Sequence, residues 1–458
     1  MQPNSTQSLS AVFSLLATNR RFAGLLLASL TLLLAAYQPA WAQFGNNNLA
    51  VLVANGTTTN TSVSVIEINK TSANQTAVQT IDLPATGANA IRVSGSGTTT
   101  LYASNSADGT LLCFTGHNTE NTSSNVTGFQ DTKTVITLNN AGTIAYPARY
   151  TGTGTNQTRG STTNNNTDFF IADQGGQYTN NATSASPTGN FRGIKTFGGV
   201  VYLSQASGVA TNIEVATTSA LTGGTITGLP GLTNNSSTFD FYLISSGTNG
   251  STFDVLYIIR NTSATAGTIA KYSLVSGTWT ANGTYTTNFG GFALAAEKSG
   301  NGAQLYVTTG AGATAANRVV RLTDAAGFNA ALDINTDNNV TLFTAAAGTI
   351  LKGVVFAPKA ADPSSVSNLL IERGISVYPN PLPRQQPLLL QFRNSAPARY
   401  EVVVYNLNGT QVVRQVVAHP GGSSIHRVEL PASLAPGTYI AEFTDTKGSR
   451  GHAKIIVH

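Results

Sequence analysis

Residues 255–274 read VLYIIRNTSATAGTIAKYSL, two short apolar runs on either side of a polar turn. The first run, Val255–Ile259, is rich in β-branched and aromatic residues, and the second, Thr268–Leu274, contains Ile269, Tyr272 and Leu274. Runs of this kind, separated by Asn, Ser, Thr and Gly, predict two antiparallel strands joined as a hairpin. The strand, turn and strand unit therefore indicates a β protein.

Similar runs recur along residues 43–356, at Leu49–Val53, Leu101–Ser104, Phe169–Ala172, Val200–Ser204, Leu305–Thr308 and Val354–Ala357. Their spacing of roughly 50 residues suits a four-stranded propeller blade with generous loops. A radial array also leaves few exposed sheet edges. The sequence predicts an all-β fold in which a six- or seven-bladed β-propeller-like domain fills residues 43–356; a long β-helix or a stacked sandwich is the alternative.

One short phrase supports a repeat. Phe191-Arg192-Gly193-Ile194 resembles Leu351-Lys352-Gly353-Val354. Two copies are weak evidence of a repeat.

Composition and charge restrict the class of protein. Charged residues make up 10% of the 458 residues, against roughly 25% in an ordinary globular protein. Residues 43–365 hold 14 basic and 15 acidic side chains, so the net charge of +5 comes from the two ends of the chain. A nucleic-acid-binding domain needs a basic surface. The charge distribution excludes that class.

The first 42 residues have the pattern of a signal peptide. Arg20 and Arg21 precede the apolar stretch Phe22–Ala36, and Ala40-Trp41-Ala42 has the small-x-small pattern of a cleavage site. We expect Sec export and cleavage after Ala42. The alternative, an uncleaved anchor, is disfavoured because the apolar stretch is shorter than the ~20 residues that span a bilayer.

A change of texture marks a second domain. Residues 357–369 are rich in Pro, Ala and Ser and predict a linker. Residues 370–458 contain longer, more regular strand-like runs, including Tyr400–Leu407 and Gln411–Val417, joined through Asn408-Gly409. This dipeptide favours tight hairpins because both residues accept positive φ. Roughly seven short strands predict a small immunoglobulin-like β-sandwich.

Four ordered motifs lie in this second domain: Val377-Tyr378-Pro379-Asn380-Pro381, Tyr405-Asn406-Leu407-Asn408-Gly409, Leu434-Ala435-Pro436-Gly437-Thr438-Tyr439 and Lys454-Ile455-Ile456-Val457. With them, residues 374–457 resemble the type A C-terminal sorting domain of the type IX secretion system, found on secreted proteins of Bacteroidetes. Asn406 stands where that family more often has an acid.

The resemblance implies partners and a location. It implies recognition by the type IX secretion machinery, export across the outer membrane and removal of the domain by the surface peptidase of that system. It further implies either release or attachment to lipopolysaccharide. It covers less than a fifth of the chain and implies nothing about the cargo domain.

Histidine and cysteine limit the chemistry of the cargo domain. His117 is the one histidine of residues 43–365, which excludes a multi-histidine zinc site and makes any triad depend on that residue. Because Thr115-Gly116-His117-Asn118 resembles a polar turn, we expect His117 to be a solvated loop residue. Cys113 lies in the apolar run Leu111–Phe114, which predicts a buried structural thiol.

Carboxylates give two candidate pairs for glycoside hydrolysis, which needs two acids roughly 5 to 9.5 Å apart. They are Asp168 with Asp173 and Asp240 with Asp254, and a turn or strand-end role is favoured for each. Residues 333–339 (DINTDNN) place oxygen-bearing side chains at alternate positions, but they lack the glycine and the acid of a calcium loop. We expect an Asx-rich turn there. The Gly-rich residues 308–313 lack the lysine of a phosphate loop.

No catalytic, cofactor-binding or metal-binding residue is assigned. Two classes of function remain, and the ligand is open in both. The favoured one is a non-enzymatic binding or adhesion module that recognises a glycan, a matrix component or another protein. The alternative is a secreted polysaccharide- or phosphoester-acting hydrolase or lyase, with acids gathered at the centre of the propeller.

Overall fold

The computed structural model describes residues 43–458 except 124, 129–131, 153–154, 207–213, 233–234, 236–237, 248–252, 264, 310–316, 362–373 and 447–449. The signal peptide expected at residues 1–42 lies outside the described residues, as does most of the expected linker. In the described part, no helix is long and apolar enough to cross a membrane.

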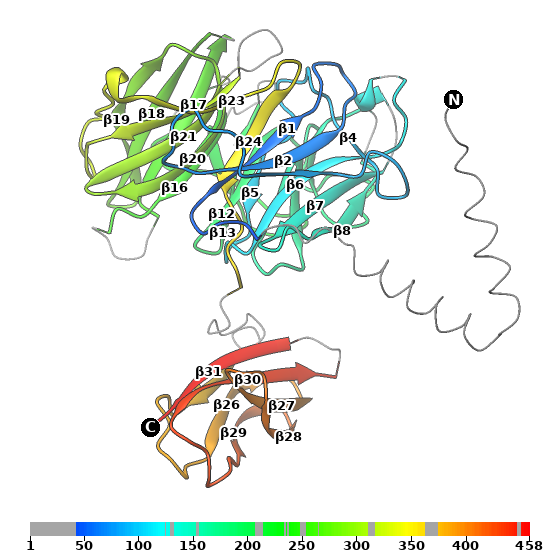
Figure 1. Ribbon diagram of the computed structural model, residues 1–458, viewed down its shortest axis with the longest axis vertical. Helices are drawn as coiled ribbons and strands as arrows, with labels where there is room; N and C mark the ends of the chain where they lie inside the picture. The colour runs from blue at the N-terminus through cyan, green and yellow to red at the C-terminus, as the bar shows by residue number, and fades with distance from the viewer. Residues whose placement is uncertain are drawn as a thin grey trace, which may run out of the picture. The chain divides into compact units, whose positions relative to one another are not determined.

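Six antiparallel sheets make up the described part of the cargo domain (Figure 1). The first three sheets are, in spatial order, β24 (Ile350–Phe356), β1 (Leu49–Ala54), β2 (Val63–Ile68), β3 (Gln79–Asp82); β4 (Ile91–Arg92), β6 (Leu111–Asn118), β7 (Lys133–Asn139), β8 (Ile144–Tyr150), with β5 (Ser104–Asn105) also on β6; and β9 (Thr158–Thr163), β10 (Phe169–Asp173), β11 (Gly176–Tyr178).

The other three sheets follow the order of the chain. They are β12 (Phe191–Phe197), β13 (Val200–Gln205), β14 (Val215–Thr218), β15 (Ile226–Gly228); β16 (Thr238–Ile244), β17 (Val255–Ser263), β18 (Ala266–Val275), β19 (Thr278–Thr287); and β20 (Gly291–Ser299), β21 (Gly302–Thr309), β22 (Arg318–Asp324), β23 (Val340–Thr344). Two 3₁₀ turns lie between strands, η1 (Val126–Gly128) and η2 (Thr336–Asn338).

One strand of each sheet faces a common axis. β24, β5, β9, β12, β16 and β20 each contact the next strand in this series, and β20 contacts β24, so the six strands close a ring. We call them the inner strands and the space they surround the central channel. The prediction of an all-β, propeller-like domain is confirmed, with six sheets in the described residues.

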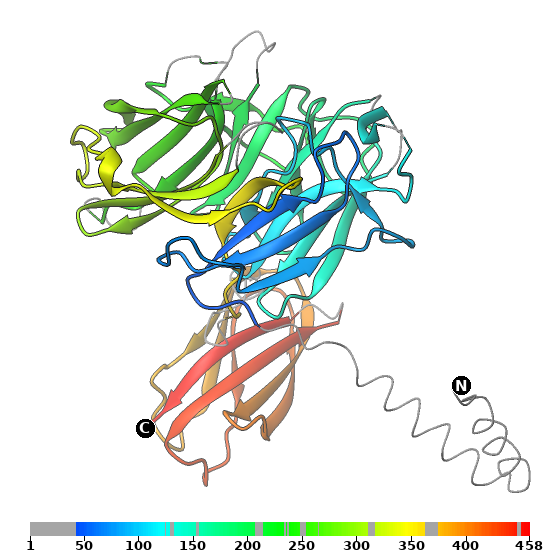
Figure 2. The same ribbon diagram turned by 45° about the horizontal axis from the view of Figure 1, so that its top comes forward.

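The ring closes where the two ends of the cargo domain meet. β24 pairs with β1, with Leu49 opposite Phe356, and Figures 1 and 2 show the yellow strand β24 beside the blue strand β1. The last strand thus completes the first sheet, and β1, paired with β24 on one side and β2 on the other, has no exposed edge.

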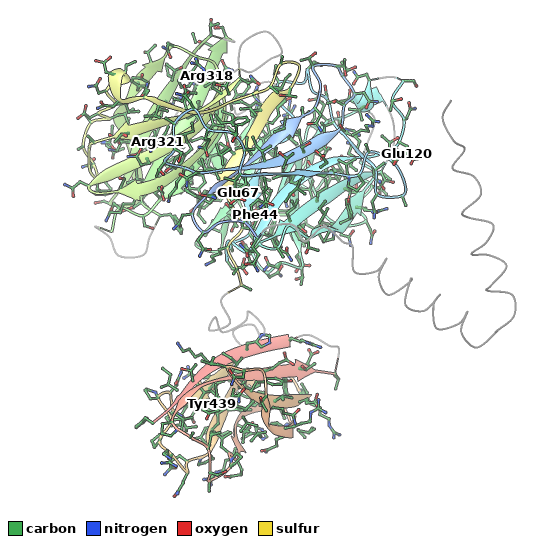
Figure 3. The ribbon with its side chains drawn as sticks, viewed as in Figure 1. Phe44, Glu67, Glu120, Arg318, Arg321 and Tyr439 are labelled. Atoms are coloured by element: carbon green, nitrogen blue, oxygen red, sulfur yellow. The ribbon has the colours of Figure 1, made fainter. Side chains whose placement is uncertain are left out.

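The residues before β1 are held by one carboxylate. Glu67 on β2, labelled with Phe44 in Figure 3, accepts hydrogen bonds from Gly45 N and Asn48 Nδ2, both 2.6 Å long. Phe44 is buried and exchanges hydrogen bonds with Asn140. The fold is therefore tied down from its first described residues.

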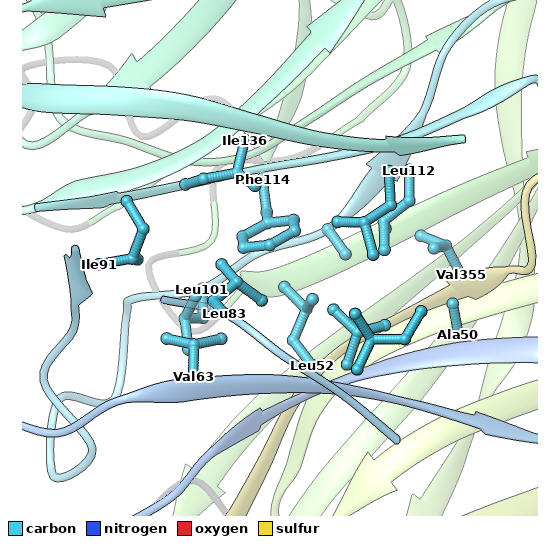
Figure 4. Close-up of a cluster of buried hydrophobic side chains, with 14 of the residues drawn as sticks. Ala50, Leu52, Val63, Leu83, Ile91, Leu101, Leu112, Phe114, Ile136 and Val355 are labelled. Carbon is cyan, nitrogen blue, oxygen red and sulfur yellow. The ribbon is translucent and has the colours of Figure 1, made fainter. Parts of the chain in front are cut away.

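Apolar side chains fill the space between neighbouring sheets. Figure 4 shows one such cluster, in which Leu52 and Val63 of the first sheet pack with Phe114 and Ile136 of the second. Full burial of each side chain of this size stabilises the fold by about 1.5–3 kcal/mol. Because each sheet packs against its neighbours, the domain needs no disulfide.

The C-terminal domain is a sandwich of two sheets. One contains β25 (Ile375–Tyr378), β26 (Leu388–Ser395) and β29 (Gly422–Val428); the other contains β28 (Gln411–His419), β27 (Ala398–Asn406), β30 (Gly437–Asp445) and β31 (Arg450–Val457). A separate apolar core, which includes Phe392, Val402 and Phe443, lies between them. The expected immunoglobulin-like sandwich is confirmed.

Candidate functional site

β-Bulges shape one end of the central channel. Five inner strands carry an extra residue near their first residues, where the pairing with the next strand shifts register: Arg159, Arg192, Phe239, Phe292 and Lys352 lie at these shifts. A bulge bends the strand and re-aims the side chain at the bulge. A sixth residue, Tyr102, lies just before the inner strand β5. It follows Leu101, a residue with φ of 63°.

These six residues, five from inner strands and Tyr102 from the segment just before β5, lie close to one another. Tyr102 stacks on Phe292 with ring centroids 4.9 Å apart, and Lys352 Nζ lies 5.2 Å from the centre of the same Phe292 ring. Arg192 lies 4.8 Å from the Phe239 ring. We call the set Tyr102, Arg159, Arg192, Phe239, Phe292 and Lys352 the bulge ring.

A glycine follows each cation of the bulge ring. The cation–glycine motif of Arg192-Gly193 and Lys352-Gly353 recurs at Arg159-Gly160. This third copy lies among polar residues, so it was not recognised from the sequence. A Cβ atom at Gly353 would lie 2.7 Å from Ala103 N. Glycine therefore lets neighbouring inner strands approach at the bulge.

An ion pair lies further along the channel. Lys195 Nζ is 2.9 Å from Asp240 Oδ2, and both side chains are buried. Lys195 also donates to Ala103 O at 3.2 Å, and Leu294 N donates to Asp240. Desolvation raises the pKa of Asp240, although Lys195 opposes the shift. The pair ties four inner segments together.

A pocket of about 510 Å³ opens where the inner strands end. Its aromatic wall contains Phe197, Tyr242, Phe253 and Phe356; the Phe197 ring centroid is 4.9 Å from that of Tyr242 and 5.4 Å from that of Phe253. Its polar lining includes Asn47, Asn105, Ser106, Asp108, Lys298 and Lys359. We call it the mouth pocket; its volume suits a small ligand.

Asp108 is the one carboxylate among the described residues that line the mouth pocket. It accepts hydrogen bonds from Ser106 Oγ at 2.6 Å, Thr110 N at 3.0 Å and Asn166 Nδ2 at 2.8 Å. Partial burial acts to raise its pKa, but these hydrogen bonds outweigh it and lower the pKa. Asp108 is therefore an ionised residue engaged in a turn, unsuited to act as a general acid.

The acids proposed as pairs each have another partner. Asp173 is buried and pairs with Lys133 at 2.9 Å, while Asp168 accepts from Asn165 at 2.8 Å. Asp254 accepts from Ser246 N and Oγ at 2.7 and 2.6 Å, whereas Asp240 pairs with Lys195. None of the four lines the mouth pocket, so they form no two-carboxylate site there.

His117 overturns one expectation. It lies inside β6 rather than in a solvated turn, and 2% of it is exposed. Gly116 allows this because Ile91 of β4 occupies the place that a Cβ atom would take, with Cγ2 at 2.7 Å. Desolvation, with a smaller effect from Lys133, lowers the pKa of His117 to about 3. Cys113 in the same strand is buried, as predicted, and burial raises its pKa.

The sequence 333–339 forms an Asx turn. Asn335 caps η2, and its side chain accepts a hydrogen bond from Asp337 N at 3.0 Å. Among the residues described, no group of three or more His, Cys, Asp or Glu side chains could hold a metal ion. Of the Gly-rich segment, Thr308 and Thr309 end β21 and the rest lies outside the described residues.

Asn380 joins the start of the sandwich to its last strand. Its side chain donates to Lys454 O and accepts from Ile456 N, both at 2.9 Å. Tyr378 ends β25, and Pro379 and Pro381 flank Asn380. The motifs of Asn380 and Lys454, about 75 residues apart in the sequence, therefore meet in the structure.

The other two motifs form local turns. Gly409 has φ of 78°, and Asn406 Oδ1 accepts from the backbone N–H of Asn408 and Thr410 at 3.0 and 2.9 Å. Asn408 itself does not have positive φ, so a longer loop with a bulge replaces the expected two-residue turn. Pro436 and Gly437 lead into β30, where Tyr439 Oη donates to Ala435 O at 2.8 Å. This contact matches the tyrosine corner of immunoglobulin-like domains.

The fold defines an all-β protein in which a propeller-like domain is followed by an immunoglobulin-like sandwich. Residues 376–458 match the family described as the secretion system C-terminal sorting domain. The C-terminal domain is thus a type IX sorting domain, and the chain is a cargo protein of that system. The sorting domain indicates interaction with the secretion machinery and an extracellular or cell-surface location.

Similarities to known proteins elsewhere in the chain are distant. PorZ of Porphyromonas gingivalis, an essential surface component of the type IX secretion system, is 8% identical over 88% of this chain, with a TM-score of 0.33, and the chain spans 64% of its length. A protein of Bacteroides uniformis provisionally assigned as a 6-phosphogluconolactonase is 13% identical over 84% of this chain and 100% of its own, with a TM-score of 0.32. No curated protein sequence matches. Such TM-scores carry no argument about function.

Proposed function

We propose that the chain is exported by the Sec route, delivered to the outer surface by the type IX system, and binds a ligand there without catalysis. The mouth pocket is the binding site, and its ligand is a glycan, a matrix component or an exposed segment of another protein. After removal of the sorting domain, the cargo domain is released or attached to lipopolysaccharide.

The composition of the mouth pocket carries this proposal. Its aromatic wall offers flat apolar surface, and Asn47, Asn105 and Ser106 add neutral hydrogen-bonding groups. Such a mixture binds an uncharged polar ligand by stacking and hydrogen bonding. The single carboxylate of the described lining, Asp108, is already engaged in a turn, so the pocket lacks the paired acids that glycoside hydrolysis requires.

Binding to an array of neutral oligosaccharides and immobilised matrix proteins tests the proposal. Phe253 is half-buried in the pocket wall, so Phe253→Ala removes contact surface while leaving the strands intact. We expect at least tenfold weaker binding for Phe253→Ala, because a lost aromatic contact costs roughly 1.4 kcal/mol or more. Val78→Ala, an exposed apolar residue outside the pocket lining, is the control. Equal binding by Phe253→Ala and the wild type would exclude the pocket.

The alternative remains a hydrolase or lyase that acts on polysaccharides or phosphoesters. It requires Asp108 to act as a catalytic group in the bound state. Release of 4-nitrophenol from its glycosides or its phosphate ester by the wild type, abolished in Asp108→Asn, would favour this alternative over pure binding.

A further inference from the structure

The bulge ring concentrates positive charge on the channel axis. Three of its six members are cations, and none is a carboxylate. The acids nearby are already paired, Asp240 with Lys195 and Asp173 with Lys133, at 2.9 Å in both pairs. The channel therefore has an excess of buried positive charge at the end where the inner strands begin.

Two of these cations are held by neutral atoms. Arg159, which is 4% exposed, donates to Asn190 Oδ1 at 2.6 Å and to Phe191 O at 3.0 Å. Lys352, which is 1% exposed, donates to Gly97 O at 2.5 Å. Burial of a cation without a counter-charge is unfavourable, so a buried anion beside these groups would be favoured.

The buried polar atoms of the bulge ring that have no hydrogen-bond partner within the described structure include the hydroxyl of Tyr102 and Nε of Arg159. The two side chains interact electrostatically with each other, and Arg192 acts on both. Each atom carries a hydrogen that an anion can accept, and buried polar groups normally find such an acceptor.

We propose that the bulge ring binds a small oxyanion, of the sulfate or phosphate class, between Tyr102, Arg159 and Lys352. Guanidinium and ammonium groups form strong charge-assisted hydrogen bonds with the oxygen atoms of such an ion, and the phenol adds a neutral donor. The site lies at the opposite end of the inner strands from the mouth pocket, so it is independent of the proposed function.

The surroundings favour a free ion over an anionic group on a polymer. Gly97 belongs to a short loop that covers Lys352, and its N–H donates to Ser94 Oγ at 3.0 Å. With Tyr102, Phe292 and Lys352 each at most 1% exposed, the ring offers no open surface for a chain of sugars.

Proton uptake should accompany binding. Burial lowers the pKa of Lys352 to about 7, and desolvation lowers that of Arg159 to about 10. A bound anion favours the ammonium form of Lys352. The pKa of Arg159, at about 10, lies above the range from pH 6 to 8.5, whereas that of Lys352 lies within it, so the pH dependence of sulfate binding reports on Lys352.

Calorimetric titration of the purified mature chain with sodium sulfate, at constant ionic strength maintained with sodium chloride, tests the proposal. We expect saturable sulfate binding that is at least tenfold tighter at pH 6 than at pH 8.5, with proton uptake at the higher pH. Sulfate is the probe for this comparison because phosphate itself titrates near neutral pH. Arg159→Gln and Lys352→Met should each weaken binding at least tenfold, whereas Arg318→Gln, at an exposed position that belongs neither to the bulge ring nor to the mouth pocket, should not.

Three results would overturn the proposal. The first is a heat of titration with sulfate no different from that with chloride. The second is sulfate affinity in Lys352→Met equal to that of the wild type; if this variant does not fold, a wild-type affinity that is constant between pH 6 and 8.5 has the same meaning. The third is binding of a sulfated disaccharide in place of free sulfate, which would show that the cations of the bulge ring recognise a sulfated glycan and not a free ion.

Discussion

At the scale of single residues, burial determines what His117 can do. The imidazole lies in β6 opposite Lys133, and its Nδ1 has no hydrogen-bond partner among the residues described. A histidine held neutral in this way is a poor base near neutral pH, since protonation would bury an unpaired charge. His117 is therefore poorly suited to act as a catalytic base.

His117 should make the protein sensitive to acid. Its pKa is about 3 in the folded state and roughly 6.5 in the unfolded state, so the unfolded chain binds the extra proton between these values. The free energy of unfolding should fall as pH decreases from 6.5 to 3, by on the order of 4 kcal/mol from this group. Denaturant titrations of wild type and His117→Gln across this range should show a shallower decrease for the variant. His458→Gln, at an exposed position, should behave like the wild type, and parallel curves for all three proteins would contradict the assignment.

Local sequence predicted some residues correctly and others not. Cys113 lies in an apolar run, and its burial followed from that run. His117 lies only four residues further, after Thr115 and Gly116, and its polar neighbours resembled a turn. The strand continues because β4 and β7 both pair with this part of β6, and no local pattern contains that information.

At the scale of elements, the bulges are the feature that the sequence conceals. A bulge exists only as two residues opposite one, so it depends on the register with a partner strand. The cation and glycine phrase was visible at Arg192 and Lys352, but its meaning was not. At Phe239 and Phe292 the bulge carries no glycine after the ring residue. No sequence pattern therefore marked these two members of the bulge ring.

Gly353→Ala should destabilise the cargo domain. A Cβ atom there would lie 2.6 Å from Ala103 Cβ, 2.7 Å from Ala103 N and 2.9 Å from Leu101 O. Because two of these atoms belong to the backbone, relief requires a shift of an inner segment, and we expect a loss of about 2–3 kcal/mol. Gly327→Ala is a matched control, since the nearest atom to its Cβ is Asn301 O at an ordinary 3.4 Å. Equal midpoints of thermal unfolding for the two variants would show that the bulge tolerates a side chain.

At the scale of the whole molecule, the strands were more predictable than their assembly. Apolar runs located strands in every sheet, and the four motifs located the sorting domain, because both depend on neighbours in the sequence. The bulge ring instead joins residues from 102 to 352, and the mouth pocket joins residues from 47 to 359. Such sites follow from closure of the ring of sheets, which no single segment encodes.

The sorting domain makes a prediction about the mature protein. Intact mass spectrometry of culture fluid and washed cells of the native host should find a chain that starts at Gln43 and lacks roughly the last 80–90 residues, as the proposed signal peptide and the removal of the sorting domain imply. Its presence in the fluid would indicate release, and its presence on washed cells would indicate attachment. A full-length chain held in the periplasm would contradict export by this route.

Asn380 allows the same measurement to test the fold of the sorting domain. Asn380→Ala removes both hydrogen bonds to β31, the contacts that join the first motif to the last. We expect a loss of roughly 1–3 kcal/mol in stability, and a larger uncleaved periplasmic fraction because a partly unfolded domain presents its motifs poorly. Gln386→Ala, an exposed neighbour whose backbone N–H bonds to Pro383 O, should be processed like the wild type. If Asn380→Ala is exported and cleaved normally, the junction between β31 and the entry turn is dispensable, and recognition must rest on the other motifs.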